Sequence, residues 1–223
     1  MTKPIICVAL MTLYEQGRFQ LTDPVAKFIP AFNDLKVLEC DEKGEAKEVD
    51  LARPPTVRSL LTHTSGLSYD FLEDYPVAEL YRQAGILNNA ERTLEELVHE
   101  LSLLPLAFQP DSNWHYSLGI DVAARLIEII SGQALEQFLK ENIFDPLGMV
   151  DTGFSVDPEE QHRIVAMYGL PDLCSPKMTM SKLFDAWSSG FNERIDVSAT
   201  YPAPKSVAFA RGGHGLFSTS WDY

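Results

Sequence analysis

The chain has 223 residues, of which 45% are hydrophobic and 22% charged, so its composition is that of a globular protein able to bury a sizeable core. Its formal net charge of -14 repels phosphate backbones and anionic membrane surfaces, which excludes nucleic acid as an expected partner. No run approaches the ~18 apolar residues that a membrane-spanning helix needs, so no membrane span is expected.

The first predicted element is a helix from about Thr2 to Glu15, which Gly17 ends. Its apolar residues lie nearly all round it, which predicts burial on most sides. The pattern of a charge followed by an apolar run also resembles a signal peptide, but no small-residue cleavage site follows it. Further on, residues 34–52 form two short extended runs around a charged tip with Gly44, which predicts a small hairpin.

Two shorter helices are predicted next. In residues 56–66, Thr56 is a plausible N-cap and Gly66 is expected to end the helix. In residues 93–104, Thr93 and Glu96 have the spacing of a capping box in front of an apolar stripe.

Residues 117–132 are predicted to form a further helix with Ser117 as N-cap and Gly132 just past its end. Residues 134–148 place apolar side chains on one helical face, and the helix is expected to stop at Asp145-Pro146.

The patterns are weaker in the last third of the chain. Residues 163–170 are predicted to form a strand. Residues 178–205 are expected to be irregular, and such a stretch is equally consistent with a lid, a substrate-facing insertion or a covering loop. Near the end, Ser218 or Thr219 is expected to cap the start of a helix.

The sequence does not indicate a metal site or a cofactor. Cys7, Cys40 and Cys174 are odd in number, far apart and without CxxC spacing, which favours free thiols or core residues over a disulfide framework or a zinc site. The five histidines form no i, i+4 pair. The patterns GxSxG, HExxH and GxxxxGK[ST] are absent, and the glycine-rich GGHGLFS lacks the strand and spacing of a dinucleotide site.

Four phrases carry a family resemblance: LLTHTSGLSY, PLAFQPDSNWHYSLGIDVAARLIEIISGQ, IFDPLGMVDTGF and GGHGLFSTSWDY. Together they resemble the serine hydrolase family related to class C β-lactamases, and especially its branch of family VIII-type carboxylesterases. The resemblance extends over nearly the whole chain, and the order and spacing of the phrases agree with the family.

The family's nucleophile lies in a Ser-x-x-Lys motif that opens a buried helix, often written Ser-Met-Thr-Lys. This chain begins Met1-Thr2-Lys3, so the resemblance makes Lys3 the catalytic lysine and places the serine directly before Met1. A serine in the first turn of a helix sits at the positive end of the dipole, which favours a developing oxyanion. A lysine three residues later lies on the same face, within reach of the hydroxyl.

The second family motif, Tyr-x-Asn, corresponds to Tyr116-Ser117-Leu118. The resemblance makes Tyr116 the general base or proton relay, and assigns Trp114 and Leu118 to substrate binding. Leu118 replaces an asparagine that can hydrogen-bond the side chain of a lactam substrate. This departure favours an esterase over a true β-lactamase.

The third family motif is Lys-Thr-Gly or His-x-Gly on a late strand. The segment around His214 does not match it, so this motif is expected beyond Tyr223. Ser65-Gly66 is better explained as a turn than as a local nucleophile, and His63 and Thr64 are expected to make structural hydrogen bonds near the site.

The resemblance implies an α+β protein with a partial β-lactamase/transpeptidase-like fold. Residues 1–223 are expected to form a single incomplete domain, truncated at both ends, with mainly the helical region, small β elements and most of the antiparallel sheet missing. An uncovered apolar face on the first helix would promote self-association. A localisation signal, if the protein has one, is expected upstream, and the cytoplasm is slightly favoured.

The activity that the resemblance implies is hydrolysis of a small-molecule ester through an acyl-serine intermediate, with this chain itself inactive because it lacks the serine. Three alternatives stay open: β-lactamase or D-amino peptidase activity, acyl transfer to an acceptor other than water, and a non-catalytic pseudoenzyme or binding protein. An in-frame serine codon just before Met1 would indicate a truncated enzyme, whereas a stop codon there would favour the pseudoenzyme.

Overall fold

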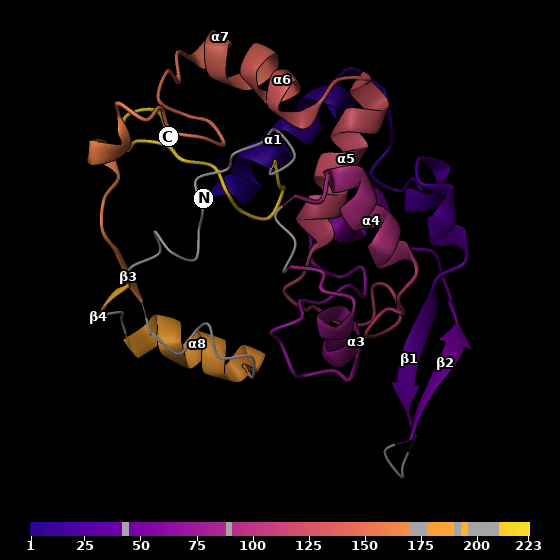
Figure 1. Ribbon diagram of the computed structural model, residues 1–223. Coiled ribbons are helices and arrows are strands. Elements are labelled where there is room, and N and C mark those ends of the chain that lie inside the picture. The colour runs from indigo at the N-terminus through magenta and orange to yellow at the C-terminus, as the bar shows by residue number, and fades with distance from the viewer. Residues whose placement is uncertain (42–44, 88–90, 170–177, 190–192, 196–209) are drawn as a thin grey trace.

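The structure is a computed structural model that describes residues 1–41, 45–87, 91–169, 178–189, 193–195 and 210–223. Helices dominate it, and the strands form small sheets (Figure 1). The helices are α1 (Thr2–Glu15), α2 (Val57–Leu61), α3 (Val77–Gln83), α4 (Leu94–Ser102), α5 (Gly119–Ser131), α6 (Leu135–Leu139), α7 (Asp145–Leu147) and α8 (Met180–Ser189). Shorter turns of helix are η1 (Val25–Lys27), η2 (Pro30–Asn33), η3 (Lys140–Phe144) and η4 (Gln161–Arg163).

The described strands pair into two antiparallel two-stranded sheets. β1 (Lys36–Cys40) pairs with β2 (Ala46–Asp50), which confirms the predicted hairpin. β3 (Met167–Gly169) lies inside the segment predicted as a strand and pairs with β4 (Glu193–Ile195). The described part of the chain is therefore α+β with little sheet, as the resemblance implies.

The core is built around α1 and α5, which pack against each other near the centre of Figure 1, while α2 and α4 pack on α5. Buried residues of α1 recur with helical spacing and include Ile6, Ala9, Leu10 and Leu13. The apolar character of α1 continues on its other side, where Val8 is 54% exposed. Within α1 only Pro4, Val8 and Glu15 are exposed and the other residues are buried or half-buried, so the predicted burial on most sides is confirmed.

Several predicted helix ends are correct. Gly17 follows α1 with a φ of +71°, and Gly132 ends α5 with a φ of +76°, both in the left-handed region that favours glycine. Thr56 caps α2, and the capping box of Thr93 and Glu96 opens α4. Thr219 accepts a hydrogen bond from the Asp222 N–H, but only a turn follows it.

Two predicted helix ends differ from those in the structure. Helix α2 ends at Leu61 rather than at Gly66: Thr62 caps it, and His63 takes a left-handed φ of 57°. Ser117 is not the N-cap of α5, since that position falls to Leu118. The Ser117 hydroxyl accepts a hydrogen bond from the Gly119 N–H at 3.3 Å and also lies 3.0 Å from His63 Nδ1.

Two further predictions differ from the structure. The helix of residues 134–148 does not stop at Asp145-Pro146: it passes through the π-helical turn η3 into α7, where proline fits the first turn, and Gly148 ends it. Residues 178–205 are not wholly irregular, since they contain α8 and β4, while residues 190–192 and 196–205 lie outside the described residues.

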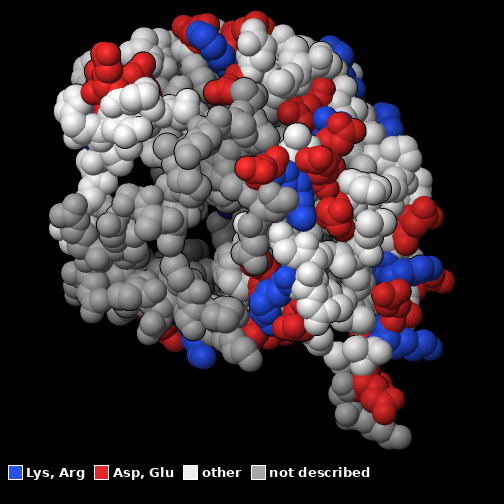
Figure 2. All heavy atoms as spheres, in the orientation of Figure 1, with Lys and Arg blue, Asp and Glu red and all other residues white. Residues whose placement is uncertain are grey.

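On the face shown in Figure 2, acidic side chains are spread over the described residues, with basic ones among them around α4 and α5. Arg125 on α5, for example, pairs with Glu95 of α4 and with Glu128 of its own helix. In the part of the chain that the structure describes, no helix combines the length and apolar character needed to cross a bilayer.

Candidate active site

Lys3 lies in the first turn of α1, and its ammonium is directed at two other parts of the chain. Its Nζ donates a hydrogen bond to the backbone carbonyl of Gly213 at 2.7 Å. The same atom lies 4.6 Å from the ring centroid of Tyr116 and 5.6 Å from that of Tyr69. The structure thus brings Lys3 and Tyr116 together, over a distance of more than a hundred residues in sequence.

Tyr116 lies between two other rings. Its ring centroid is 5.1 Å from that of His63 and 5.1 Å from that of Tyr69. Burial, followed by the charge of Asp121 and the hydrogen-bonded Tyr116, raises the pKa of Tyr69 well above its ordinary value. Tyr69 therefore stays protonated at neutral pH and serves as a neutral hydroxyl beside Tyr116.

His63 forms the other wall beside Tyr116. Burial lowers the pKa of His63 to about 4, and the nearby Lys3 ammonium and His115 add to this shift. The neutral ring is in hydrogen-bond contact with Ser117 and adopts a left-handed backbone conformation. The expected structural hydrogen bonding near the site is confirmed for His63, and Thr64 donates to Asp111.

His63 gives the protein a pH dependence of stability whose sign follows from its pKa. Its ordinary pKa is 6.5 and its folded pKa about 4, so the unfolded chain binds more protons between these values. His63 therefore contributes nothing above pH 6.5 and destabilises the fold as the pH falls from 6.5 towards 4. We expect urea denaturation to show a shallower loss of unfolding free energy on acidification in His63→Asn than in the unchanged chain. Equal slopes would contradict this, and ring NMR of His63 gives an independent check of its titration.

Trp114 and Leu118 have different environments. Trp114 is 47% exposed, stacks on Phe184 of α8 at 6.3 Å between ring centroids, and meets the edge of His63 at 6.3 Å. Leu118 is 1% exposed and lies in the core at the start of α5, so the structure does not bring it to the surface that Trp114 lines.

The glycine-rich segment near the C-terminus packs against three parts of the fold. The Leu216 N–H donates to the Thr2 hydroxyl at 3.2 Å, and Gly153 and Phe217 exchange two backbone hydrogen bonds. The N–H groups of Gly212 and Gly213 donate to Asp121. This segment therefore holds the start of α1 and builds one side of the site.

Sequence reasoning missed three residues around Lys3: Tyr69, Asp121 and Gly213. Tyr69 is the last residue of the phrase LLTHTSGLSY, which carries part of the family resemblance, but the sequence assigned it no role. Asp121 offered a signal, because it is a single acid on the apolar face of a helix and is only 1% exposed. A charge at a core position requires hydrogen-bonding partners, and these come from the glycine pair.

A second serine–histidine pair lies deeper in the fold. Ser68 Oγ is 2.9 Å from His115 Nε2, and burial lowers the pKa of His115. Ser68 is fully buried and His115 is 2% exposed, so a substrate does not reach this pair. Ser65 is also buried, and its Oγ accepts from Leu67 N at 3.4 Å, in keeping with its expected place in a turn.

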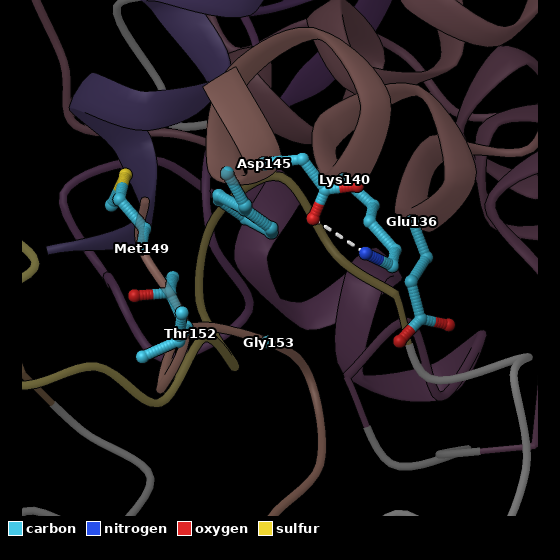
Figure 3. Close-up of a pocket in the computed structure, with 8 residues that line it drawn as sticks. Glu136, Lys140, Asp145, Met149, Thr152 and Gly153 are labelled. Atoms are coloured by element: carbon cyan, nitrogen blue, oxygen red, sulfur yellow. Dashed lines mark hydrogen bonds and ion pairs between the residues drawn. The ribbon is translucent and has the colours of Figure 1, made fainter. Parts of the chain in front are cut away.

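A cavity of about 280 Å³ lies elsewhere, along α6, η3, α7 and the turn that follows (Figure 3). Among its three charged lining residues, Lys140 and Asp145 pair with each other at 2.5 Å, and Glu136 is the third. Met149 and Gly153 line it as well. The cavity shares no lining residue with the Lys3 cluster, so we assign it no part in the chemistry.

Metal ligation finds no support in the described residues, where no group of three or more His, Cys, Asp or Glu side chains could hold an ion. Cys7 and Cys40 carry free thiols, and Cys174 lies outside the described residues. Burial raises the pKa of the Cys7 thiol despite the nearby Lys3.

Known proteins resemble this chain in sequence. Lovastatin esterase of Penicillium rubens is 37% identical over 154 residues, which cover 69% of this chain and 38% of that protein. Monacolin J acid methylbutanoyltransferase of Aspergillus terreus is 31% identical over 223 residues, which cover all of this chain and 49% of that protein. The chain spans about half the length of the curated relatives that match it throughout.

Solved structures of related enzymes resemble this chain in fold. EstCE1, a hydrolase with promiscuous acyltransferase activity, superposes with a TM-score of 0.71 and 27% identity, covering 99% of this chain and 54% of that one. Half coverage of that structure is consistent with a partial fold in which most of the antiparallel sheet is missing. The family model described as Beta-lactamase matches residues 1–223. The chain therefore belongs to the β-lactamase family of serine hydrolases and acyltransferases.

Proposed function

We propose that this chain is part of a serine hydrolase that cleaves small carboxylic esters through an acyl-serine intermediate. The observation that carries the proposal is the position of the Lys3 ammonium, in the first turn of α1 and 4.6 Å from the Tyr116 ring centroid. A serine one residue before Met1 would stand one helical turn from Lys3, at the positive end of the α1 dipole.

The chemistry then needs only these groups and water. The serine oxygen attacks the ester carbonyl carbon, and its proton passes to the Lys3–Tyr116 pair. The pair returns a proton to the departing alkoxide, which leaves as the alcohol. Water next attacks the acyl-serine, and the acid is released as the serine recovers its proton.

Two features support an ester as the substrate. Leu118 stands where the family motif has asparagine, so this position offers no side-chain amide to bind a lactam side chain. The half-exposed Trp114, stacked on Phe184 and against His63, gives an apolar surface that leads towards Tyr116. Trp114 would contact the apolar part of a small ester.

Acyl transfer is the second candidate, because the relatives include a named acyltransferase and a hydrolase with acyltransferase activity. The same acyl-serine would serve both reactions, and the acceptor decides between them. Two other possibilities remain. β-Lactamase or D-amino peptidase activity predicts nitrocefin turnover, and a non-catalytic pseudoenzyme predicts no acylation.

We also propose that residues 1–223 form one incomplete domain. Support comes from the half-length match to relatives and from the apolar Val8 on the open side of α1. The exposed Met1 and Val8 on this side of α1 are where we propose that copies of the chain associate.

The experiment uses a longer protein in which a serine directly precedes Met1. We expect a p-nitrophenyl ester to give a burst of p-nitrophenol, and mass spectrometry to find the acyl group on that serine. Added alcohol should yield a new ester only if the enzyme transfers acyl groups, so product analysis separates the two activities. An acyl adduct on another residue, or no adduct with any ester or nitrocefin, would overturn the proposal.

A further inference from the structure

Asp121 on α5 is a buried carboxylate that the proposed ester chemistry does not use. It is 1% exposed, and its Oδ1 accepts hydrogen bonds from the N–H of Gly212 at 3.0 Å and of Gly213 at 2.9 Å. Burying an ionised carboxylate is costly unless hydrogen bonds or an opposite charge compensate for the lost water. Here the compensation comes from the backbone of a turn that lies about ninety residues later in the chain.

The turn formed by Gly212 and Gly213 is pressed onto α5. A Cβ atom on Gly212 would lie 2.1 Å from the carbonyl oxygen of Ile120, and one on Gly213 would lie 2.5 Å from Asp121 Oδ2. Both distances are far below a van der Waals contact, so any side chain at either position would push the turn away from the helix. The glycines permit an approach that only the bare backbone can make.

The other side of this turn holds Lys3. The Gly213 carbonyl accepts the hydrogen bond of the Lys3 ammonium at 2.7 Å, while the N–H of the same residue donates to Asp121. One residue therefore links the buried carboxylate to the lysine. The contact between Leu216 N–H and the Thr2 hydroxyl holds the next part of the segment to the start of α1.

Charged groups also act on the surroundings of Asp121, whose second oxygen, Oδ2, is buried without a hydrogen-bond partner among the described residues. Burial lowers the pKa of Arg211, and the charge of Asp121 opposes this effect. Burial, Arg211 and Lys3 lower the pKa of His214, whereas the charge of Asp121 raises it. The carboxylate thus lies among the positive charge of Arg211, two backbone N–H groups and the imidazole of His214.

We infer that Asp121 is a positioning residue that holds the Gly212–Gly213 turn on α5 and thereby fixes the carbonyl that keeps the Lys3 ammonium against Tyr116. The inference concerns where Lys3 is held, and it rests on the proposed function only for the catalytic value of that position. Asp121 itself touches no reacting atom.

The test measures how fast formaldehyde and borohydride methylate Lys3, by mass spectrometry of the chain, with the exposed Lys47 as internal reference. Asp121→Ala should speed the modification of Lys3 about tenfold relative to Lys47, as expected from loss of a hydrogen bond to a charged group. Asp121→Asn keeps an oxygen that accepts from both glycines, so it should restore slow modification. Glu128→Ala is the matched control, because Glu128 on the same helix also accepts a backbone hydrogen bond, from Leu135.

An unchanged Lys3 rate in Asp121→Ala, or an equal rise in Glu128→Ala, would overturn the inference. If Asp121→Ala fails to fold, amide hydrogen exchange of the unchanged protein tests the inference. Slow exchange at Gly212 and Gly213 supports the hydrogen bonds that hold the turn on Asp121, and exchange as fast as in an unstructured peptide refutes them. In the longer, serine-bearing protein Asp121→Ala should lower kcat with little change in KM. Altered Lys3 modification in a protein without esterase activity would uphold the positioning role and refute the proposed function.

Discussion

Chain 1–223 is expected to hydrolyse a short-chain p-nitrophenyl ester about 10⁶-fold more slowly than a comparable serine enzyme with its nucleophile in place. The reason is chemical: in the proposed mechanism Lys3 and Tyr116 transfer a proton, but neither supplies the oxygen that forms the acyl intermediate. The hydroxyl nearest to Lys3 in sequence, that of Thr2, is 4% exposed and accepts a hydrogen bond from Leu216. The Thr2 hydroxyl therefore makes a structural hydrogen bond and is too buried to act as the nucleophile.

The measurement compares kcat of chain 1–223 with kcat of the longer protein that carries a serine before Met1. Turnover by chain 1–223 that survives purification and disappears in Tyr116→Phe would contradict the prediction, because it would require another nucleophile served by the same site. Turnover that survives in Tyr116→Phe would point to a contaminating esterase, and mass spectrometry for an acyl adduct separates the two cases.

The sequence predicted those parts of the fold that depend on neighbouring residues. The capping box of Thr93 and Glu96 and the left-handed glycines after α1 and α5 are local devices, and all of them are present. The ends that were predicted wrongly depend on details of side-chain and backbone conformation that spacing does not show. Ser117, for example, has the side chain of an N-cap and accepts from the Gly119 N–H, but its hydroxyl also contacts His63, 54 residues away in sequence.

The candidate site also has a part that could be predicted from the sequence and a part that could not. Lys3 and Tyr116 could be named from motif phrases, since the family resemblance supplies their roles. The contact that holds Lys3, its hydrogen bond to Gly213, spans 210 residues, and no spacing rule connects two such positions. The isolated acid at position 121 and the glycine pair were both visible in the sequence, but only the fold shows that they meet.

Lys3→Met and Tyr116→Phe, each made in the serine-bearing protein, are expected to lower kcat for ester hydrolysis by about 10² to 10⁴, the usual contribution of a positioned proton-transfer group. Tyr116→Phe keeps the ring that packs between His63 and Tyr69, so it removes the hydroxyl and little else. Lys3→Met keeps much of the side-chain volume and removes the ammonium that Gly213 binds.

The double variant decides whether these two residues act as one unit. The proposed mechanism has both residues handle the same proton, so we expect the double variant to lose little more than either single variant, as groups of one catalytic unit do. Tyr75→Phe and Lys47→Met are the matched controls: Tyr75 packs on His115 and Phe108, and Lys47 lies exposed on β2. A Tyr116→Phe variant with nearly unchanged kcat, or losses that multiply in the double variant, would show that Lys3 and Tyr116 do not share the proton. Their close contact at the start of α1 would then serve packing and charge balance alone.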